Sequence, residues 1–402
     1  MIIIISLIFF APKAAVAQEH VPWWEFQSVD TMKYSRDTAR ENSSNTSFDA
    51  TIDFQIKAIA DLGATHVAIA TPYDAEFIPF LKKWVSTARQ YGLYVWFRGN
   101  FSGWEKWFDY PPITAEEHKT KTEQFILGHP DLFEEGDIFS SCPECENGNL
   151  GDPRLTRNVQ GYRDFIISEY NVTQNAFAKI NKKNIPNYFS MNGDIAKLIM
   201  DKETTQALGN IVVIDHYVPT SDRLVKDINS LADQSGGKIV LGEIGVPIPD
   251  INGNMTEEEQ SMWLNDAFTK LTKIKSLIGV NYWVGFGGST ELWGEGGIPR
   301  PAIGIVHSYF SPKLLKGNVV NDLGRGISDV SVKSADKEIV TDNTGYFAIP
   351  YLSNKTLVQF SKQGYRSQEY VIGSQKEIKI YLKIIQENFL QKIIRQILSY
   401  IR

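Results

Sequence analysis

Three glutamates follow two short apolar runs and have the chemistry of acid–base catalysts. Glu243 ends the run 238–243, which predicts a buried strand, and Glu144 and Glu146 follow the run 137–141. One protonated and one ionised carboxyl group beside a glycosidic bond can protonate the leaving oxygen and attack the anomeric carbon. Such a pair works only where its surroundings push the two pKa values apart.

Short apolar runs alternate along the chain with stretches of helical period, which is the pattern of a parallel sheet covered by helices. The predicted strands are residues 24–30, 66–71, 93–98, 137–141, 187–191, 211–217, 238–243 and 278–285. Eight strands, mostly separated by helices, predict an α/β fold, a (β/α)8 TIM barrel. A doubly wound open sheet is the alternative, although no glycine-rich phosphate loop follows the first strand.

Active-site residues of such a barrel lie at the carboxyl ends of its strands. The fourth and seventh strands face each other across the barrel mouth, so Glu243 would meet Glu144 or Glu146 in one pocket. A surface residue that opens a loop is the alternative role for Glu243. Arg98 ends the third strand, where it either holds a catalytic carboxylate charged or closes a structural salt bridge. Tyr217 ends the sixth strand on its inward face.

Tryptophan is frequent, with nine among 402 residues. A tryptophan in a cleft presents a large flat face on which a sugar ring can stack. Trp283 in the eighth strand and Trp293 after it are candidate sugar platforms, and Trp104, after the third strand, would add a subsite. Each of the three is equally compatible with packing in the core.

The strand-end residues resemble those of the clan A retaining glycoside hydrolases, the group that includes the family 5 cellulases and mannanases. In that group the acid/base is a Glu after the fourth strand, and the nucleophile is a Glu after the seventh. A Tyr on the sixth strand often hydrogen-bonds the nucleophile, and a Trp ends the eighth strand. Over residues 24–311, the resemblance implies these roles for Glu144, Glu243, Tyr217 and Trp283.

One departure from that family concerns the residue before the acid/base, which is usually an Asn that contacts the sugar. Here Pro143 precedes Glu144, Cys145 precedes Glu146, and Asn147 follows both. Strand register favours Glu144 as the acid/base, and the alternative role for Glu146 is to order the loop. Asn147 stays among the candidate substrate-binding residues.

Composition changes after residue 312. Residues 316–384 carry short alternating strands separated by turn signals, which predict a small all-β sandwich. The motif Thr-Asp-x-x-Gly-x-Phe at residues 341–347 resembles the carboxypeptidase regulatory-like modules. That resemblance implies a non-catalytic spacer or adhesion unit behind a catalytic domain of residues 18–312.

The two ends of the chain carry their own signals. Residues 1–17 form an apolar run that closes on Ala-Val-Ala, which is typical of an export signal peptide, although no Lys or Arg precedes the run. We therefore expect a secreted or cell-surface protein. Residues 385–402 form an amphipathic tail, for which weak membrane or cell-surface contact is an alternative to packing on its own domain.

Charge and composition exclude several classes of function. A net charge of −6 and a pI near 5.7 leave no basic footprint for nucleic acid. His, Asp and Glu show no metal-ligand spacing, so we expect neither metal nor cofactor. The only cysteines, Cys142 and Cys145, are too few for a zinc site and predict a short-range disulfide in an exported chain.

These observations predict an exported, monomeric, retaining glycoside hydrolase, an endo-β-glycanase that binds carbohydrate through its barrel. The alternative is a catalytically inactive barrel that only binds glycan or serves in cell-surface adhesion. An active enzyme of this type needs its two carboxyl groups about 5 Å apart.

Overall fold

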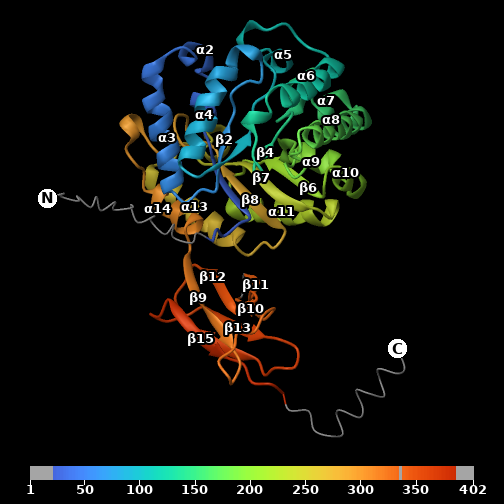
Figure 1. Cartoon of the computed structure of the whole chain (residues 1–402). Helices are drawn as coiled ribbons and strands as arrows, with labels where there is room; N and C mark the ends of the chain where they lie inside the picture. The colour runs from blue at the N-terminus through green and yellow to red at the C-terminus, as the bar shows by residue number, and fades with distance from the viewer. Residues whose placement is uncertain (1–20, 335–336, 386–402) are drawn as a thin grey trace, which may run out of the picture.

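The computed structural model describes residues 21–334 and 337–385 (Figure 1). The predicted signal peptide, residues 1–17, lies outside this part of the chain, as does the predicted tail beyond residue 385. Within the described ranges, every helix is too short or too polar to cross a bilayer.

Eight parallel strands form the first unit. They are β1 (Phe26–Asp30), β2 (His66–Ile69), β3 (Tyr94–Phe97), β4 (Ile138–Phe139), β5 (Ser190–Asn192), β6 (Ile211–Asp215), β7 (Lys238–Ile244) and β8 (Leu277–Tyr282). The sheet runs in the order β4-β3-β2-β1-β8-β7-β6-β5. A parallel bridge between Phe139 and Asn187 joins its two end strands and closes the barrel. The predicted TIM barrel is confirmed, and the open-sheet alternative is wrong.

Helices cover the outside of the barrel (Figure 1). The longer ones are α3 (Asp49–Asp61), α4 (Ile78–Gln90), α6 (Ala115–Gly128), α8 (Val159–Lys179), α9 (Gly193–Ile199), α10 (Lys202–Ala207), α11 (Ser221–Ser235), α13 (Glu257–Leu271) and α14 (Ala302–Phe310). Short helices follow several strands: α1 (Met32–Ser35), α2 (Ala39–Asn42), α5 (Ser102–Glu105), α7 (Pro153–Thr156) and α12 (Pro249–Asn252). Capping boxes begin α6 at Thr114 and α13 at Thr256, which satisfies backbone donors that a helix otherwise leaves unpaired.

The interior of the barrel has an apolar base. One buried cluster draws residues from all sides of the barrel: Phe26, Ala68, Trp96, Ile138, Tyr188, Val213, Val240 and Ile278. Because side chains alternate along a strand, inward residues recur every second position towards the carboxyl ends. Arg98 and Asp215 lie two positions beyond Trp96 and Val213, and Asp30 lies four positions beyond Phe26, which brings all three into the barrel mouth.

A small all-β unit follows α14. Its strands are β9 (Lys313–Val320), β10 (Ser331–Lys333), β11 (Glu338–Val340), β12 (Tyr346–Tyr351), β13 (Leu357–Ser361), β14 (Gln368–Val371) and β15 (Glu377–Tyr381). They form a four-stranded sheet and a three-stranded sheet around a separate apolar core. The predicted small all-β domain is confirmed, whereas its resemblance to carboxypeptidase regulatory-like modules stays a prediction.

The packing of the barrel base generates a stability prediction. Gly279 of β8 pairs with Phe26 of β1, and a Cβ atom at Gly279 would lie 2.1 Å from the Phe26 ring. Gly279→Ala should therefore lower the free energy of unfolding by about 1–3 kcal/mol, because the ring has to leave its place. Gly304→Ala in α14 meets no atom within 4 Å. It should raise stability by up to about 1 kcal/mol.

Urea denaturation of the two variants beside the wild type measures both effects. Equal stability of Gly279→Ala and the wild type would show that the base of the barrel is not packed as described.

Candidate active site

A single buried cation lies at the centre of the barrel mouth. The side chain of Arg98, which follows β3, is 1% exposed. Its guanidinium lies 3.1 Å from Asp30, 3.2 Å from Asp215 and 3.1 Å from Glu243. It also donates to the carbonyl oxygen of Gly242 at 2.7 Å. Arg98 thus connects the ends of β1, β3, β6 and β7 through ion pairs and a hydrogen bond. That it also holds a catalytic carboxylate charged stays a prediction.

A β-bulge in β7 sets the direction of the Glu243 side chain. Val240 and Gly242 face the barrel interior, so strict alternation would turn Glu243 outward. The register with β6 shifts at this point, however, because Ile214 pairs with Leu241 and Asp215 pairs with Glu243. The bulge leaves Gly242 without a partner on β6 and turns the next side chain toward the barrel mouth.

Both oxygens of the Glu243 carboxyl group have a partner. Arg98 lies at Oε1, and the Tyr217 hydroxyl donates to Oε2 at 2.7 Å. Burial and the neighbouring Asp215 raise the pKa of Glu243 to about 8, while Arg98 and the Tyr217 hydrogen bond act against that rise. These two partners favour the ionised form of Glu243, whereas burial and Asp215 oppose it. The hydrogen bond from Tyr217 that the family resemblance implied is present.

Glu144 lies in the loop after β4, close enough to Glu243 for the two charges to interact. Burial, together with the charges of Glu243 and Glu146, raises the pKa of Glu144 to about 7. Its carboxylate accepts a hydrogen bond from the side-chain amide of Asn147 at 3.2 Å, which is a neutral partner. Glu144 therefore keeps its proton more readily than a surface glutamate does.

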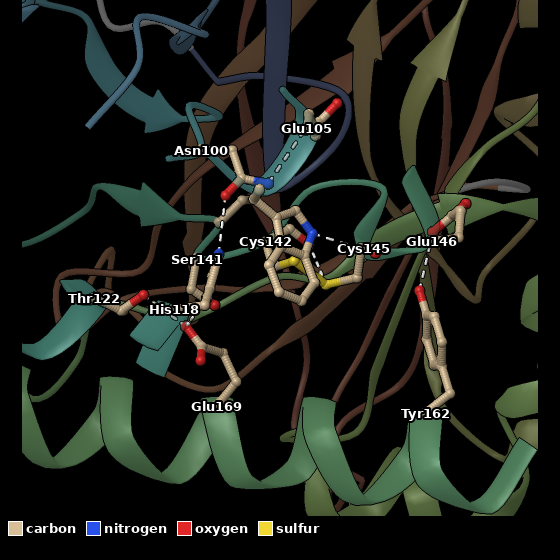
Figure 2. The surroundings of a disulfide bond; sticks show 12 residues. Asn100, Glu105, His118, Thr122, Ser141, Cys142, Cys145, Glu146, Tyr162 and Glu169 are labelled. Carbon is tan, nitrogen blue, oxygen red and sulfur yellow. Dashed lines mark hydrogen bonds and ion pairs between the residues drawn. A yellow bond between two sulfur atoms is a disulfide. The ribbon is translucent and has the colours of Figure 1, made fainter. Parts of the chain in front are cut away.

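Glu146 is occupied by structural contacts. The Tyr162 hydroxyl of α8 donates to it at 2.9 Å, and the backbone amide of Asn192 donates at 3.3 Å. Figure 2 shows Glu146 directed toward Tyr162. The contacts therefore distinguish the two acid/base candidates. The charge of Glu144 interacts with Glu243, whereas Glu146 hydrogen-bonds to α8 and β5 and so anchors the loop.

The three candidate sugar platforms lie in different surroundings. Trp283 is half-buried in the barrel mouth, edge-on to Tyr217 with ring centroids 5.8 Å apart. Trp104 is only 2% exposed and stacks on Phe165 of α8, so its prediction as a sugar platform is wrong. Trp293 is 7% exposed and stacks on Phe286 at 4.7 Å, which covers one of its faces.

Sequence reasoning missed a further carboxyl group beside the site. Glu105 on α5 accepts a hydrogen bond from Asn100 at 3.2 Å (Figure 2). Burial, with the charges of Glu144 and Glu146, raises the pKa of Glu105 to about 8. Its position after the third strand was a usable signal, but only the folded loop shows that its side chain turns back toward Glu144.

The sulfur atoms of Cys142 and Cys145 are joined in a disulfide, as predicted. Across residues 21–334 and 337–385, no cluster of three or more His, Cys, Asp or Glu side chains has a geometry suited to a metal ion.

Comparison with known proteins places the barrel among the glycoside hydrolases by fold. The sequence matches no protein-family model and no curated protein. A GH5_18 structure from Bifidobacterium longum subsp. longum has a TM-score of 0.54 and 16% identity, and the match covers 77% of this chain and 85% of that one. The barrel shares its fold with family GH5.

Two further solved structures of glycoside hydrolases have a similar fold. A GH5_18 variant from Streptomyces cattleya in complex with Manb1-4GlcNAc has a TM-score of 0.53 at 11% identity, covering 75% of this chain and 85% of that one. ZgEngAGH5_4 in complex with a cellotriose has a TM-score of 0.50 at 13% identity, covering 71% of this chain and 96% of that one. At these identities the likeness is one of fold.

The charge cluster around Arg98 generates a second prediction. In an Arg98→Met variant, Asp30, Asp215 and Glu243 would be buried without a cation, at a cost of about 3–5 kcal/mol in the free energy of unfolding. The three carboxyl groups would take up protons in the folded state, so their folded pKa values would rise further above the unfolded ones. Stability would then fall as pH rises, and the loss should be larger at pH 8 than at pH 5.

Chemical denaturation at both pH values measures this loss. The control is Lys57→Met, which removes an exposed ion pair with Asp61 and should change stability little at either pH. A loss for Arg98→Met that does not depend on pH would contradict the charge arrangement.

Glu144 generates a third prediction. Its pKa of about 7 in the folded state lies above the ordinary value of 4.5, so the wild type loses stability as pH rises from about 4.5 through 7. Glutamine carries no charge, so Glu144→Gln should melt above the wild type at pH 8, with the difference shrinking toward pH 4.5. Glu338→Gln removes an exposed carboxylate whose pKa is lowered by Ser331, and it should give no gain at pH 8.

Thermal melts from pH 4.5 to 8 measure the difference. A gain for Glu144→Gln that is equal at every pH would argue against a raised pKa at this residue.

Proposed function

We propose that the protein is a retaining glycoside hydrolase in which Glu243 is the nucleophile and Glu144 is the acid/base. One observation carries the proposal: two buried carboxyl groups interact in the barrel mouth, but only one of them contacts a cation. Arg98 at 3.1 Å and Tyr217 at 2.7 Å favour the ionised form of Glu243. Glu144 has only a neutral amide partner, and burial raises its pKa to about 7. The pKa of Glu243 is also raised, to about 8, so the assignment rests on the contacts of the two groups and not on the order of their pKa values. One ionised and one protonated carboxyl group are what double displacement requires.

In the first step, an oxygen of Glu243 attacks the anomeric carbon while the proton of Glu144 passes to the glycosidic oxygen. The carbon–oxygen bond to the leaving group breaks, and a glycosyl ester forms on Glu243. The negative charge of Glu243 disappears in this step, and that of Glu144 appears. Arg98 then faces a neutral ester together with Asp30 and Asp215.

In the second step, Glu144 is ionised and takes a proton from water. The hydroxyl oxygen attacks the anomeric carbon from the face that the leaving group vacated, and Glu243 is released as a carboxylate. Two inversions at one carbon give a sugar of retained configuration. Tyr217 donates its hydrogen bond to the returning carboxylate and positions it for the next cycle.

The substrate we propose is a β-linked glycan, cleaved outside the cell. Trp283 offers a half-buried aromatic face beside Tyr217, suited to the apolar face of a sugar. The solved neighbours carry Manb1-4GlcNAc and a cellotriose, which guides the choice of test substrates. The apolar residues 1–17 support export, and the small all-β unit fits a spacer role.

A fourth prediction tests the two roles. Glu243→Gln should lose reducing-sugar release on β-glucans, β-mannans and xylans by several orders of magnitude, because no nucleophile remains. Glu144→Gln should lose about 10²–10⁴-fold, because acid–base assistance is lost. Because the pKa of Glu144 is about 7 and that of Glu243 about 8, the form with Glu144 protonated and Glu243 ionised is most populated between these values, so wild-type kcat/KM should peak between pH 7 and 8 and fall on either side. Proton NMR of the first product should show retained anomeric configuration.

Unchanged release by Glu243→Gln would overturn the assignment of the nucleophile. If the wild type binds a glycan of this panel but releases no sugar from it, the result would favour a barrel that only binds glycan.

A further inference from the structure

The loop after β4 carries Glu144 in an unfavourable backbone conformation. We call residues 140–148 the acid/base loop. Within it, Glu144 has φ 46° and ψ 53°, in the left-handed region. This conformation costs a residue other than glycine about 1–2 kcal/mol, so it persists only where the surroundings hold it.

The Cys142–Cys145 disulfide closes a small ring around this residue. The two Cα atoms lie 5.3 Å apart, and Pro143 and Glu144 are the only residues between them. Proline fixes its own φ angle, so Glu144 is the one residue between the two cysteines whose φ and ψ are both free to rotate. Both cysteines are buried, at 0% and 1% exposed.

An indole ring packs against the closed loop. Trp104 donates from Nε1 to the carbonyl oxygen of Cys145 at 3.3 Å. A Cβ atom on Gly148 would lie 2.2 Å from the same Nε1 atom, so the far end of the loop also lies against the ring. Trp104 is itself fixed by its stack on Phe165. The loop that the disulfide closes therefore packs against a side chain that is itself held in place.

The other anchors of the loop are hydrogen bonds. The Glu144 backbone amide donates to the Ser190 carbonyl oxygen at 2.8 Å, and the Glu144 carbonyl oxygen accepts from the Asn147 amide at 2.9 Å. Glu146 binds Tyr162 and the Asn192 amide two residues further along. The disulfide is the one covalent link that spans both sides of Glu144 within the described chain.

We propose that the Cys142–Cys145 disulfide is a positioning element for the acid/base, because it holds the left-handed backbone that directs the Glu144 carboxyl group toward Glu243. The inference rests on the proposed function of Glu144 as the acid/base. Its consequence is that acid–base catalysis needs an oxidised loop, whereas nucleophilic attack by Glu243 does not. A disulfide of this kind persists in an oxidising compartment, in keeping with the expected export.

The test compares a Cys142→Ala/Cys145→Ala double variant with Ile138→Ala. Ile138 lies on β4 at the opposite end, in the apolar base of the barrel, and its truncation destabilises the same strand without touching the loop. The substrates share one sugar: an unactivated glycan and a 2,4-dinitrophenyl glycoside, whose leaving group needs little protonation. The double variant should lose about 10²-fold in kcat/KM on the glycan, the scale of a misplaced catalytic group. It should lose less than about 10-fold on the aryl glycoside.

Equal losses on both substrates, or wild-type kcat/KM on both, would overturn the proposal. Ile138→Ala should show no dependence on the leaving group. If the double variant does not fold, Cys145→Ala alone breaks the same bond and gives the same comparison. Glu243→Gln separates the two claims, because its full activity on both substrates would defeat the proposed function itself.

A second readout does not depend on turnover. Carbon-13 NMR of labelled glutamate side chains, with Glu144 assigned by its absence in Glu144→Gln, follows the titration of this carboxyl group. Its pKa of about 7 should fall toward the ordinary value in the double variant, as the loop opens to water, and should stay in place in Ile138→Ala. An unchanged titration in the double variant would overturn the positioning role even if no substrate were cleaved.

Discussion

One guanidinium group determines how the barrel mouth is built. Arg98 is the cation shared by Asp30, Asp215 and Glu243, and these side chains come from strands far apart in the sequence. One positive charge cannot balance three negative ones in a region of low dielectric constant. Burial, together with the neighbouring carboxyl groups, raises the pKa of Asp215 to about 7 and that of Glu243 to about 8, although Arg98 acts against both rises. The carboxyl groups of the mouth therefore bind protons more tightly than exposed ones do.

The apolar base beneath this cluster gives it a rigid support. Large side chains from every strand fill the lower barrel, as Phe26 and Trp96 do with ring centroids 5.8 Å apart. The polar groups lie in the next inward layer and rest on this base. The apolar residues that stabilise the barrel and the charged residues of its mouth thus lie at opposite ends of the same strands, which is the division expected of this barrel architecture.

Much of this arrangement could be predicted from sequence because it depends on periodicity. Strand ends located Glu243, Tyr217 and Arg98 correctly at the mouth, since a parallel barrel gathers its strands' carboxyl ends. The β7 bulge could not be predicted, because counting by twos turns Glu243 outward. The left-handed backbone of Glu144 could not be predicted either, because its torsions are imposed by the disulfide and not by local preference.

Burial of aromatic residues was the least predictable feature. Trp104 and Trp283 both follow barrel strands and carry the same side chain, yet one lies in the helical layer and the other in the mouth. Their difference depends on which helix covers each loop, and that is a property of the assembled barrel. Glu105 was missed for a related reason, since α5 turns it back toward a loop 39 residues further along the chain.

The bulge at Gly242 also limits how such a site can change. A Cβ atom there would lie 2.4 Å from Asp215 Oδ1, so no side chain fits between Glu243 and its acidic neighbour. Any substitution at Gly242 therefore has to displace Asp215, which contacts Arg98. New specificity in such a barrel is thus expected to arise in the loops that follow its strands, and not at this position.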